Sequence, residues 1–241
     1  MATQAETSGW NWTQHVQAVG REALSMAAGR VVPSAFFLAS ALAKLQALAD
    51  LLRDRHDLPD RLVALSFYAT CAYRAATIVF FLLIAAFFAI RLNPVRSSPG
   101  AWQTIVALAG TYCMMLVSVA GQANVSPAVT IVAAVIMCGG TVFSALALIQ
   151  LGRSLSISPE ARRLVTTGLY AVIRHPMYLG EMLGSVGMVL QSMSPVSALV
   201  FAVFCLLQIK RMDYEEGVLQ SVFPDYCLYR ARTARLIPGI Y

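Results

Sequence analysis

Long apolar segments alternate with short polar ones along most of this chain. Residues 97–152 and 182–209 contain no Asp, Glu, Lys or Arg. A helix that crosses a bilayer needs about 20 apolar residues, so these stretches are long enough to hold several. We expect apolar helices at residues 31–52, 62–90, 101–121, 127–150, 176–191 and 195–209. The pattern predicts an all-α fold, a polytopic transmembrane helical bundle of about five to six spans.

The segment before the first span is more polar. Apolar positions at helical spacing over residues 12–30 predict an interfacial helix or a lead-in to that span. The first residues include Glu6 and Trp10 and lack the basic-then-apolar order of a secretory signal peptide. The start of the chain is therefore not expected to be a signal peptide.

Basic residues are distributed unevenly between the connections. The loops at 91–100 and 151–175 and the tail at 210–241 carry Arg or Lys, whereas the connections at 122–126 and 192–195 carry none. Because cytoplasmic loops are enriched in Lys and Arg, we expect the first set in the cytoplasm, with both termini on that side. The compact length and the lack of a targeting signal favour a bacterial inner membrane, with an organelle membrane as the alternative.

Composition supports a membrane protein and narrows its function. Of the 241 residues, 58% are hydrophobic and 12% are charged, about half the charged share of a soluble domain. The net charge of +6 is carried by residues that flank apolar segments, which indicates anchoring to anionic membrane lipids and not nucleic-acid binding. The cysteines and histidines lack metal-ligand spacing, so no metal is expected. Lys44 and Arg74, inside apolar segments, are either functional charges or snorkelling side chains.

The first cluster of candidate site residues precedes the helix expected after residue 175. Pro176 disfavours a helical conformation at His175 and suits a first helical turn, so a helix should begin at Pro176. Its free N–H groups, beside Arg174 and His175, would attract a carboxylate or a phosphate. Basic residues alone also mark such a boundary. Gly168 and a turn at Pro159 would let the preceding loop fold over the helix end and form a lidded pocket.

Acidic residues form the second candidate cluster. Glu181 lies one turn inside an apolar helix, where a carboxylate needs a partner or a cation. Glu215 and Glu216 lie on the expected helical extension of the last span. Adjacent carboxylates repel each other, so they are either solvated, which is the ordinary outcome, or hold a cation. A functional role is favoured only because both clusters are expected on the same face.

Four elements occur together in this part of the chain: an Arg-His-Pro-x-Tyr-x-Gly element, a preceding Gly-x-Tyr turn, a Glu-Glu pair after the last span, and an aromatic and basic tail that includes Ile-Pro. They correspond to residues 174–180, 168–170, 215–216 and 226–238. In this combination the chain resembles the C-terminal half of the isoprenylcysteine carboxyl methyltransferase-like family, which includes phospholipid N-methyltransferase relatives.

The resemblance covers residues 145–241 and implies a cytoplasmic catalytic region that binds S-adenosylmethionine. The methyl acceptor would be lipophilic or small and reached from the bilayer, its reacting group a carboxylate, a thiol or an amine. Residues 1–144 would form N-terminal transmembrane helices, to which the resemblance assigns no role. The oligomeric state is not indicated.

The resemblance also implies roles for individual residues. The glutamates would face the cofactor's ammonium or ribose, and the tyrosines its sulfonium or adenine. An amine or alcohol acceptor would need Glu181 or Glu216 as a base. The catalytic candidates are Arg174, Glu181 and Glu216. The cofactor-binding candidates are Gly168, Leu169, Tyr170, His175, Tyr178, Glu215, Glu216 and Tyr226.

Two other functions are compatible with parts of the pattern. Membrane reductases of the sterol reductase type have a similar Arg-His-Pro-x-Tyr element and use NADPH, but their variable position is commonly Asn, where this chain has Met177. The Glu215-Glu216 pair also favours the methyltransferases. A non-enzymatic membrane scaffold or transporter is the third possibility. Polar groups at mid-membrane are typical of transporters, and the uncharged residues 97–152 argue against that function.

Overall fold

The computed structural model describes residues 12–53, 60–97, 100–119 and 123–241. The prediction that the chain does not start with a signal peptide rests mainly on residues 1–11, which lie outside the described residues.

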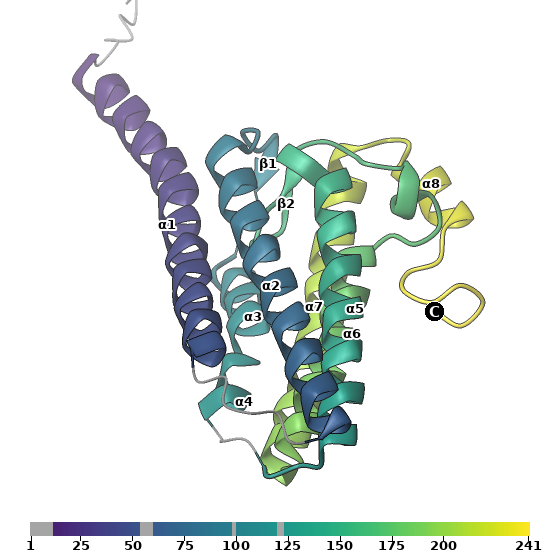
Figure 1. The fold of residues 1–241 in the computed structure, drawn as a ribbon. Coiled ribbons are helices and arrows are strands. Elements are labelled where there is room, and N and C mark those ends of the chain that lie inside the picture. Colours follow the sequence, from purple (N-terminus) through teal and green to yellow (C-terminus); the bar gives the residue numbers. More distant parts are fainter. Residues whose placement is uncertain (1–11, 54–59, 98–99, 120–122) are drawn as a thin grey trace, which may run out of the picture.

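The described chain is built almost entirely from helices, which confirms the predicted all-α fold (Figure 1). A two-residue antiparallel ladder pairs Arg96–Ser97 (β1) with Glu160–Ala161 (β2), with Arg96 opposite Ala161. The helices and strands, in chain order, are α1 (Trp12–Arg53), α2 (Arg61–Ile90), β1 (Arg96–Ser97), α3 (Ala101–Tyr112), α4 (Met115–Val119), α5 (Pro127–Leu151), η1 (Gly152–Ser154), β2 (Glu160–Ala161), η2 (Gly168–Ala171), α6 (Pro176–Ser192), α7 (Pro195–Val222) and α8 (Tyr226–Arg232).

Local capping residues define the starts of the long helices. Asp60 accepts a hydrogen bond from the Leu62 N–H at the start of α2, and Ser126 and Ser194 do the same for α5 and α7. Each cap satisfies an N–H group that has no partner within the helix. Proline follows each serine at the first helical position, where its missing N–H costs nothing. These signals explain why the predicted boundaries of α2 and α5 are correct to one residue.

Three helices differ from the expected spans. The helix expected at 31–52 begins at Trp12, because the helical spacing of residues 12–30 continues into it without a break. The span expected at 101–121 divides into α3 and α4. The last helix runs past the apolar span at 195–209 to Val222, which confirms the helical extension expected at Glu215 and Glu216; this polar continuation contains no proline before Pro224. Hydrophobicity alone locates the buried part of a helix and not its full length.

Four helical segments among the described residues are long and apolar enough to cross a membrane: Gly29–Arg53, Arg61–Ile90, Pro127–Ser154 and Pro195–Val222. The protein is therefore a multi-pass integral membrane protein. α6 has 17 residues and α3 has 12, shorter than the roughly 20 residues of a typical span. The predicted five to six spans thus correspond to four full-length candidates and two shorter helical segments.

The helices form an elongated bundle with α1 along its outer edge (Figure 1). One end carries β1, β2 and α8 and is called the site end. The opposite end carries α4 and the α6–α7 turn and is called the far end. The start of α1 lies toward the site end, as α8 does.

Glycines bring α5 and α6 into close contact. A Cβ placed on Gly140 would lie 2.6 Å from the carbonyl oxygen of Gly180 and 2.8 Å from the Cα of Gly184. Such small-residue interfaces are typical of helices packed inside membranes. Nearby, the Ser144 hydroxyl donates a hydrogen bond of 3.1 Å to the carbonyl of Met177, in the first turn of α6. The α5–α6 contact therefore fixes where the first turn of α6 lies.

Candidate functional site

The backbone before α6 is held by the C-terminal tail. Ile173 and Ala234 form a parallel bridge, and the N–H groups of Arg174 and His175 donate to the carbonyls of Ala234 (2.9 Å) and Arg235 (3.2 Å). The helix then begins at Pro176, as the sequence predicts. Residues far apart in sequence thus meet at the site end of the bundle.

Glu216 of α7 lies at the centre of an ion cluster. Its Oε1 atom is 3.0 Å from Arg174 Nε, 3.0 Å from His175 Nε2 and 3.2 Å from Arg235 Nε. Only 6% of Glu216 is exposed. Arg174 also donates to backbone carbonyls of Arg230 (3.1 Å) and Thr233. The Glu216 cluster therefore joins α7, the entry to α6 and the tail.

The loop that follows α5 forms the opposite side of the site. The carboxylate of Glu160 accepts hydrogen bonds from Ser156 and Arg162 and lies 3.8 Å from Arg91. The β1–β2 ladder adds backbone pairing between this loop and residues 96–97. The Leu92 N–H also donates to the carbonyl of Arg153 at 2.8 Å. The connection after α2 therefore supports the loop that follows α5.

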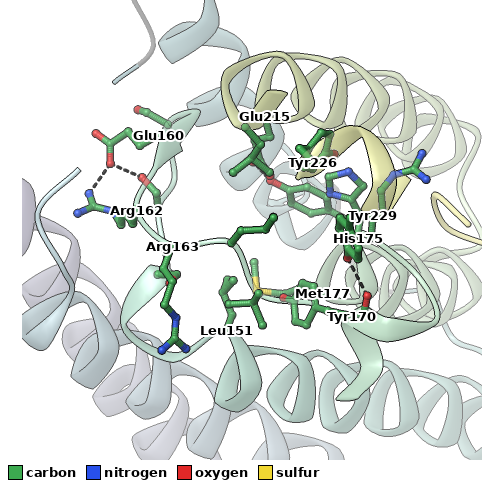
Figure 2. Close-up of a pocket in the computed structure, with 18 residues that line it drawn as sticks. Leu151, Glu160, Arg162, Arg163, Tyr170, His175, Met177, Glu215, Tyr226 and Tyr229 are labelled. Carbon is green, nitrogen blue, oxygen red and sulfur yellow. Dashed lines mark hydrogen bonds and ion pairs between the residues drawn. The ribbon is translucent and has the colours of Figure 1, made fainter. Parts of the chain in front are cut away.

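A pocket lies between this loop and the Glu216 cluster, and is called the site pocket. Glu160, Arg162 and Arg163 lie on one side of it and His175, Tyr226 and Tyr229 on the other (Figure 2). The remaining polar and aromatic lining residues are Ser154, Ser156, Ser158, Tyr170, Arg174, Tyr178 and Glu215.

Tyr178 connects several groups in the wall of the pocket. Its hydroxyl donates a hydrogen bond to Glu215. The Arg211 guanidinium lies 4.8 Å from the centre of the Tyr178 ring, and the His175 ring stacks on it with centroids 5.6 Å apart. The Tyr178 hydroxyl thereby fixes the Glu215 carboxylate at the pocket, next to the stacked rings of Tyr178 and His175.

Two further tyrosines are kept neutral. The Tyr229 hydroxyl donates to the backbone carbonyl of Tyr170 at 2.7 Å. Burial raises the pKa of Tyr229 to about 12, and burial raises the pKa of Tyr170 well above its ordinary value of 10. Both side chains therefore present neutral rings to the site pocket at physiological pH.

Three buried polar atoms at the site pocket lack a hydrogen-bond partner within the described part of the chain: Ser154 Oγ, Arg162 Nε and the Tyr226 hydroxyl. A buried polar group without a partner costs about 1–3 kcal/mol, and such groups are uncommon in native proteins. All three atoms are hydrogen-bond donors. All three residues line the site pocket, so a polar ligand bound there would lie near donors that have no partner within the described chain.

The structure brings six of the ten predicted site residues to the pocket wall: Tyr170, Arg174, His175, Tyr178, Glu215 and Tyr226. Gly168 and Leu169 shape the adjoining loop. Gly168 has a φ of 63°, a conformation that favours glycine, and the Leu169 N–H donates to Gln150 Oε1 at 2.7 Å. The other two predicted residues that do not line the pocket are Glu216, which lies in its ion cluster, and Glu181.

Glu181 lines a different cavity, which lies between the helices. Its carboxylate accepts a hydrogen bond of 2.7 Å from Gln208, and Gln208 accepts one of 2.8 Å from Arg211. Gln208 is therefore the partner that a carboxylate at this position inside the bundle was expected to need. Apolar side chains of the N-terminal helices, including Phe37 and Phe80, line the same space, called the interhelical cavity.

Sequence reasoning missed several residues of the site. Arg162 and Arg163 follow the expected turn at Pro159. As a pair of basic residues on the expected site face, they could have been identified from the sequence. Arg211 lies beside the polar end of the last span. By contrast, the contact of Arg235 with Glu216 depends on the path of the tail, which no local pattern indicates.

Comparison with known proteins connects this region to a family. Residues 128–226 match the family model of phospholipid methyltransferases. These residues extend from α5 to the first residue of α8 and include the loop, α6 and α7. The match therefore contains most of the site pocket and starts earlier than residue 145, where the resemblance seen in the sequence begins.

Individual relatives match the same part of the chain. Protein-S-isoprenylcysteine O-methyltransferase B of Arabidopsis thaliana is 35% identical over 108 residues, 42% of this chain and 55% of the relative. The cobalt-zinc-cadmium resistance protein CzcN of Cupriavidus metallidurans is 33% identical over 78 residues, 32% of this chain and 36% of the relative. The matched part thus spans about half the length of the plant methyltransferase.

A solved structure of the eukaryotic intramembrane Ras methyltransferase, isoprenylcysteine carboxyl methyltransferase, is also similar. It has a TM-score of 0.42 and 15% sequence identity, and the comparison covers 89% of this chain and 96% of that one. The match of residues 128–226 to the phospholipid methyltransferase family model, together with the similarity to the plant enzyme, confirms the predicted resemblance to isoprenylcysteine methyltransferase-like membrane methyltransferases.

Proposed function

We propose that this protein is a membrane methyltransferase that binds S-adenosylmethionine in the site pocket and methylates a lipophilic or small-molecule acceptor. The observation that carries the proposal is the group of three buried donors without partners, on Ser154, Arg162 and Tyr226. A ligand with a carboxylate and hydroxyl groups would satisfy them. The matched family supports the same reaction class.

The other wall of the pocket suits the positive part of the cofactor. Glu215, held by Tyr178, would pair with the ammonium. The neutral rings of Tyr170 and Tyr229 offer aromatic faces to a sulfonium or an adenine. Donors on one side and a carboxylate with tyrosines on the other therefore fit a ligand that carries both charges.

The bound cofactor supplies a methyl carbon made electrophilic by its sulfonium. The protein's part is to align the acceptor and to exclude water. Arg174 and Glu216 act in this proposal by holding the tail against the entry to α6, as does His175. Gly168 and Leu169 act by shaping the loop that covers the pocket.

The acceptor would approach through the interhelical cavity. Residues 1–144 would then shape the acceptor site through α1, α2 and α3, and residues 145–241 would form the catalytic region. Glu181, which lines this cavity, would contact the acceptor and would take the proton if the acceptor is an amine. The distribution of basic residues supports a cytoplasmic site end with both termini on that side. The membrane would be a bacterial inner membrane, for which the compact length is the argument.

Binding of S-adenosylhomocysteine to the purified full chain tests the cofactor proposal. Glu215→Gln keeps an acceptor for the Tyr178 hydroxyl and removes the charge. We expect affinity to fall about 10- to 100-fold, since a hydrogen bond to a charged group contributes about 1.5–3 kcal/mol. Isothermal titration calorimetry measures the change.

Asp225→Asn is the matched control, because Asp225 is exposed and is not among the residues that line the site pocket. It should bind S-adenosylhomocysteine as the wild type does. Equal affinity of the wild type and Glu215→Gln would show that the Glu215 charge does not contribute to binding. Binding of NADPH without binding of S-adenosylhomocysteine would replace the proposal with the reductase alternative.

A further inference from the structure

A third cavity lies toward the far end of the bundle, away from the site pocket. Two cationic side chains line it, Lys44 from α1 and Arg74 from α2, and it is called the basic cavity. Neutral polar residues line it as well, among them Asn124 from the connection before α5 and Gln191 near the end of α6. The basic cavity therefore extends from the surface of the far end into the bundle.

The two cations are held near each other. Arg74 donates a hydrogen bond of 2.6 Å to the carbonyl oxygen of Ala47, one turn after Lys44 on α1. Both side chains line the same cavity, so their positive charges lie near each other. The residues that line the basic cavity include neither Asp nor Glu, and the ion pairs of the described chain do not include Lys44 or Arg74.

Elsewhere in the bundle a buried cation is compensated. Arg211 is 3% exposed and is connected through Gln208 to the carboxylate of Glu181. Tyr178 contacts Arg211, and its hydroxyl donates a hydrogen bond to the carboxylate of Glu215. Charges inside a membrane protein are costly and are commonly paired. Lys44 and Arg74 depart from this rule and together create a site of positive potential.

Helix length places Arg74 near the far boundary of the membrane. Residues 75–90 of α2 contain no charge and separate Arg74 from Arg91. Sixteen helical residues extend about 24 Å, compared with a hydrocarbon core of about 30 Å. A long basic side chain snorkels several ångströms toward the headgroups. Arg74, and Lys44 beside it, can therefore reach the phosphate level of the far leaflet.

We propose that the basic cavity binds the phosphate of an anionic phospholipid from the far leaflet. One ammonium and one guanidinium suit a phosphate, for which both are common binding groups. The cavity also has apolar walls, including Val117 and Met188, and Leu45 next to Lys44 is 50% exposed. These apolar surfaces can contact acyl chains, which a free phosphate ion lacks. The bound lipid would join α1 to α2 and to the end of α6.

Native mass spectrometry of the full chain, titrated with phosphatidylglycerol, tests the proposal. The variants Lys44→Met and Arg74→Met keep side-chain length and remove charge. Affinity for phosphatidylglycerol should fall about fivefold for each cation removed, and about 25-fold in the double variant. In neutral detergent the variants should melt at or above the wild-type temperature, because an uncompensated charge has been removed.

Arg53→Gln is the matched control, since Arg53 lies on the same helix near the far end, is 77% exposed and pairs with Asp50. It should keep the wild-type affinity. Equal binding of phosphatidylcholine and phosphatidylglycerol would overturn the proposal. So would equal stabilisation by inorganic phosphate, which would identify an anion site without lipid. Neither result depends on methyl transfer.

Discussion

Glu216→Gln is expected to destabilise the site end by about 3 kcal/mol and to lower methyl transfer at least about 100-fold. The carboxylate offsets the charges of Arg174 and Arg235 and holds His175 in a nearly buried cluster. Removing one partner of a buried ion pair leaves the others uncompensated, which costs about 3–5 kcal/mol. A displacement of about 1 Å in the groups that align a reaction can lower its rate about 100-fold. Thermal melting and a methyltransferase assay measure the two effects.

Asp213→Asn is the control for this variant, because Asp213 also contacts Arg235, at 2.6 Å, but is 44% exposed. We expect a loss of less than about 1 kcal/mol, as for a surface ion pair. Trypsin reports release of the tail, since Arg230 and Arg232 follow the start of α8. Faster cleavage there is expected only in Glu216→Gln. Equal stability of the two variants would show that the Glu216 cluster does not hold the tail.

The ion cluster explains why part of the site belongs to the end of the chain. Arg174 and His175 precede α6, yet their backbone N–H groups bond to carbonyls of the tail and their side chains contact Glu216. A pocket built in this way forms only when α6, α7 and the tail are all in place. Binding of a cofactor is therefore expected to stabilise the tail as well as the pocket.

The helices were predictable because their signals are local. Ser126-Pro127 and Ser194-Pro195 each combine a cap with a proline in the first turn. Pro176 begins α6 as a first-turn proline, and there the preceding His175 makes no side-chain cap. The break between α3 and α4 was not predictable, because Cys113 and Met114 are apolar and have no turn signal. The polar extension of α7 beyond residue 209 was expected as far as Glu215 and Glu216, and the helix continues from there to Val222.

The site was predictable to a lesser degree. Motif residues such as Tyr178 and Glu215 could be identified because their types and spacing carry the signal. The roles of Glu181 and Glu216 depend on partners more than 25 residues away in sequence, Gln208 for one and Arg174 for the other. Which carboxylate faces the site pocket follows from helix rotation and packing, and a single sequence does not determine these.

Gly140→Ala is expected to destabilise the protein by at least about 2 kcal/mol and to reduce methyl transfer strongly. The added methyl would meet backbone atoms of Gly180 and Gly184, and backbone cannot move aside as a flexible side chain can. Overpacking a close contact costs about 1–3 kcal/mol. The shift would also displace the first turn of α6, which Ser144 fixes through Met177, and with it Tyr178 in the pocket wall.

Gly139→Ala is the control that separates packing from helix propensity. Apart from its chain neighbours and the nearby backbone of its own helix, a Cβ at Gly139 would meet no atom within 4 Å in the described structure. Alanine favours a helix over glycine by about 1 kcal/mol. This variant should melt at or above the wild-type temperature and keep full activity. A Gly140→Ala protein as stable and active as Gly139→Ala would mean that α5 and α6 are not in close contact, and that the position of the site does not depend on that contact.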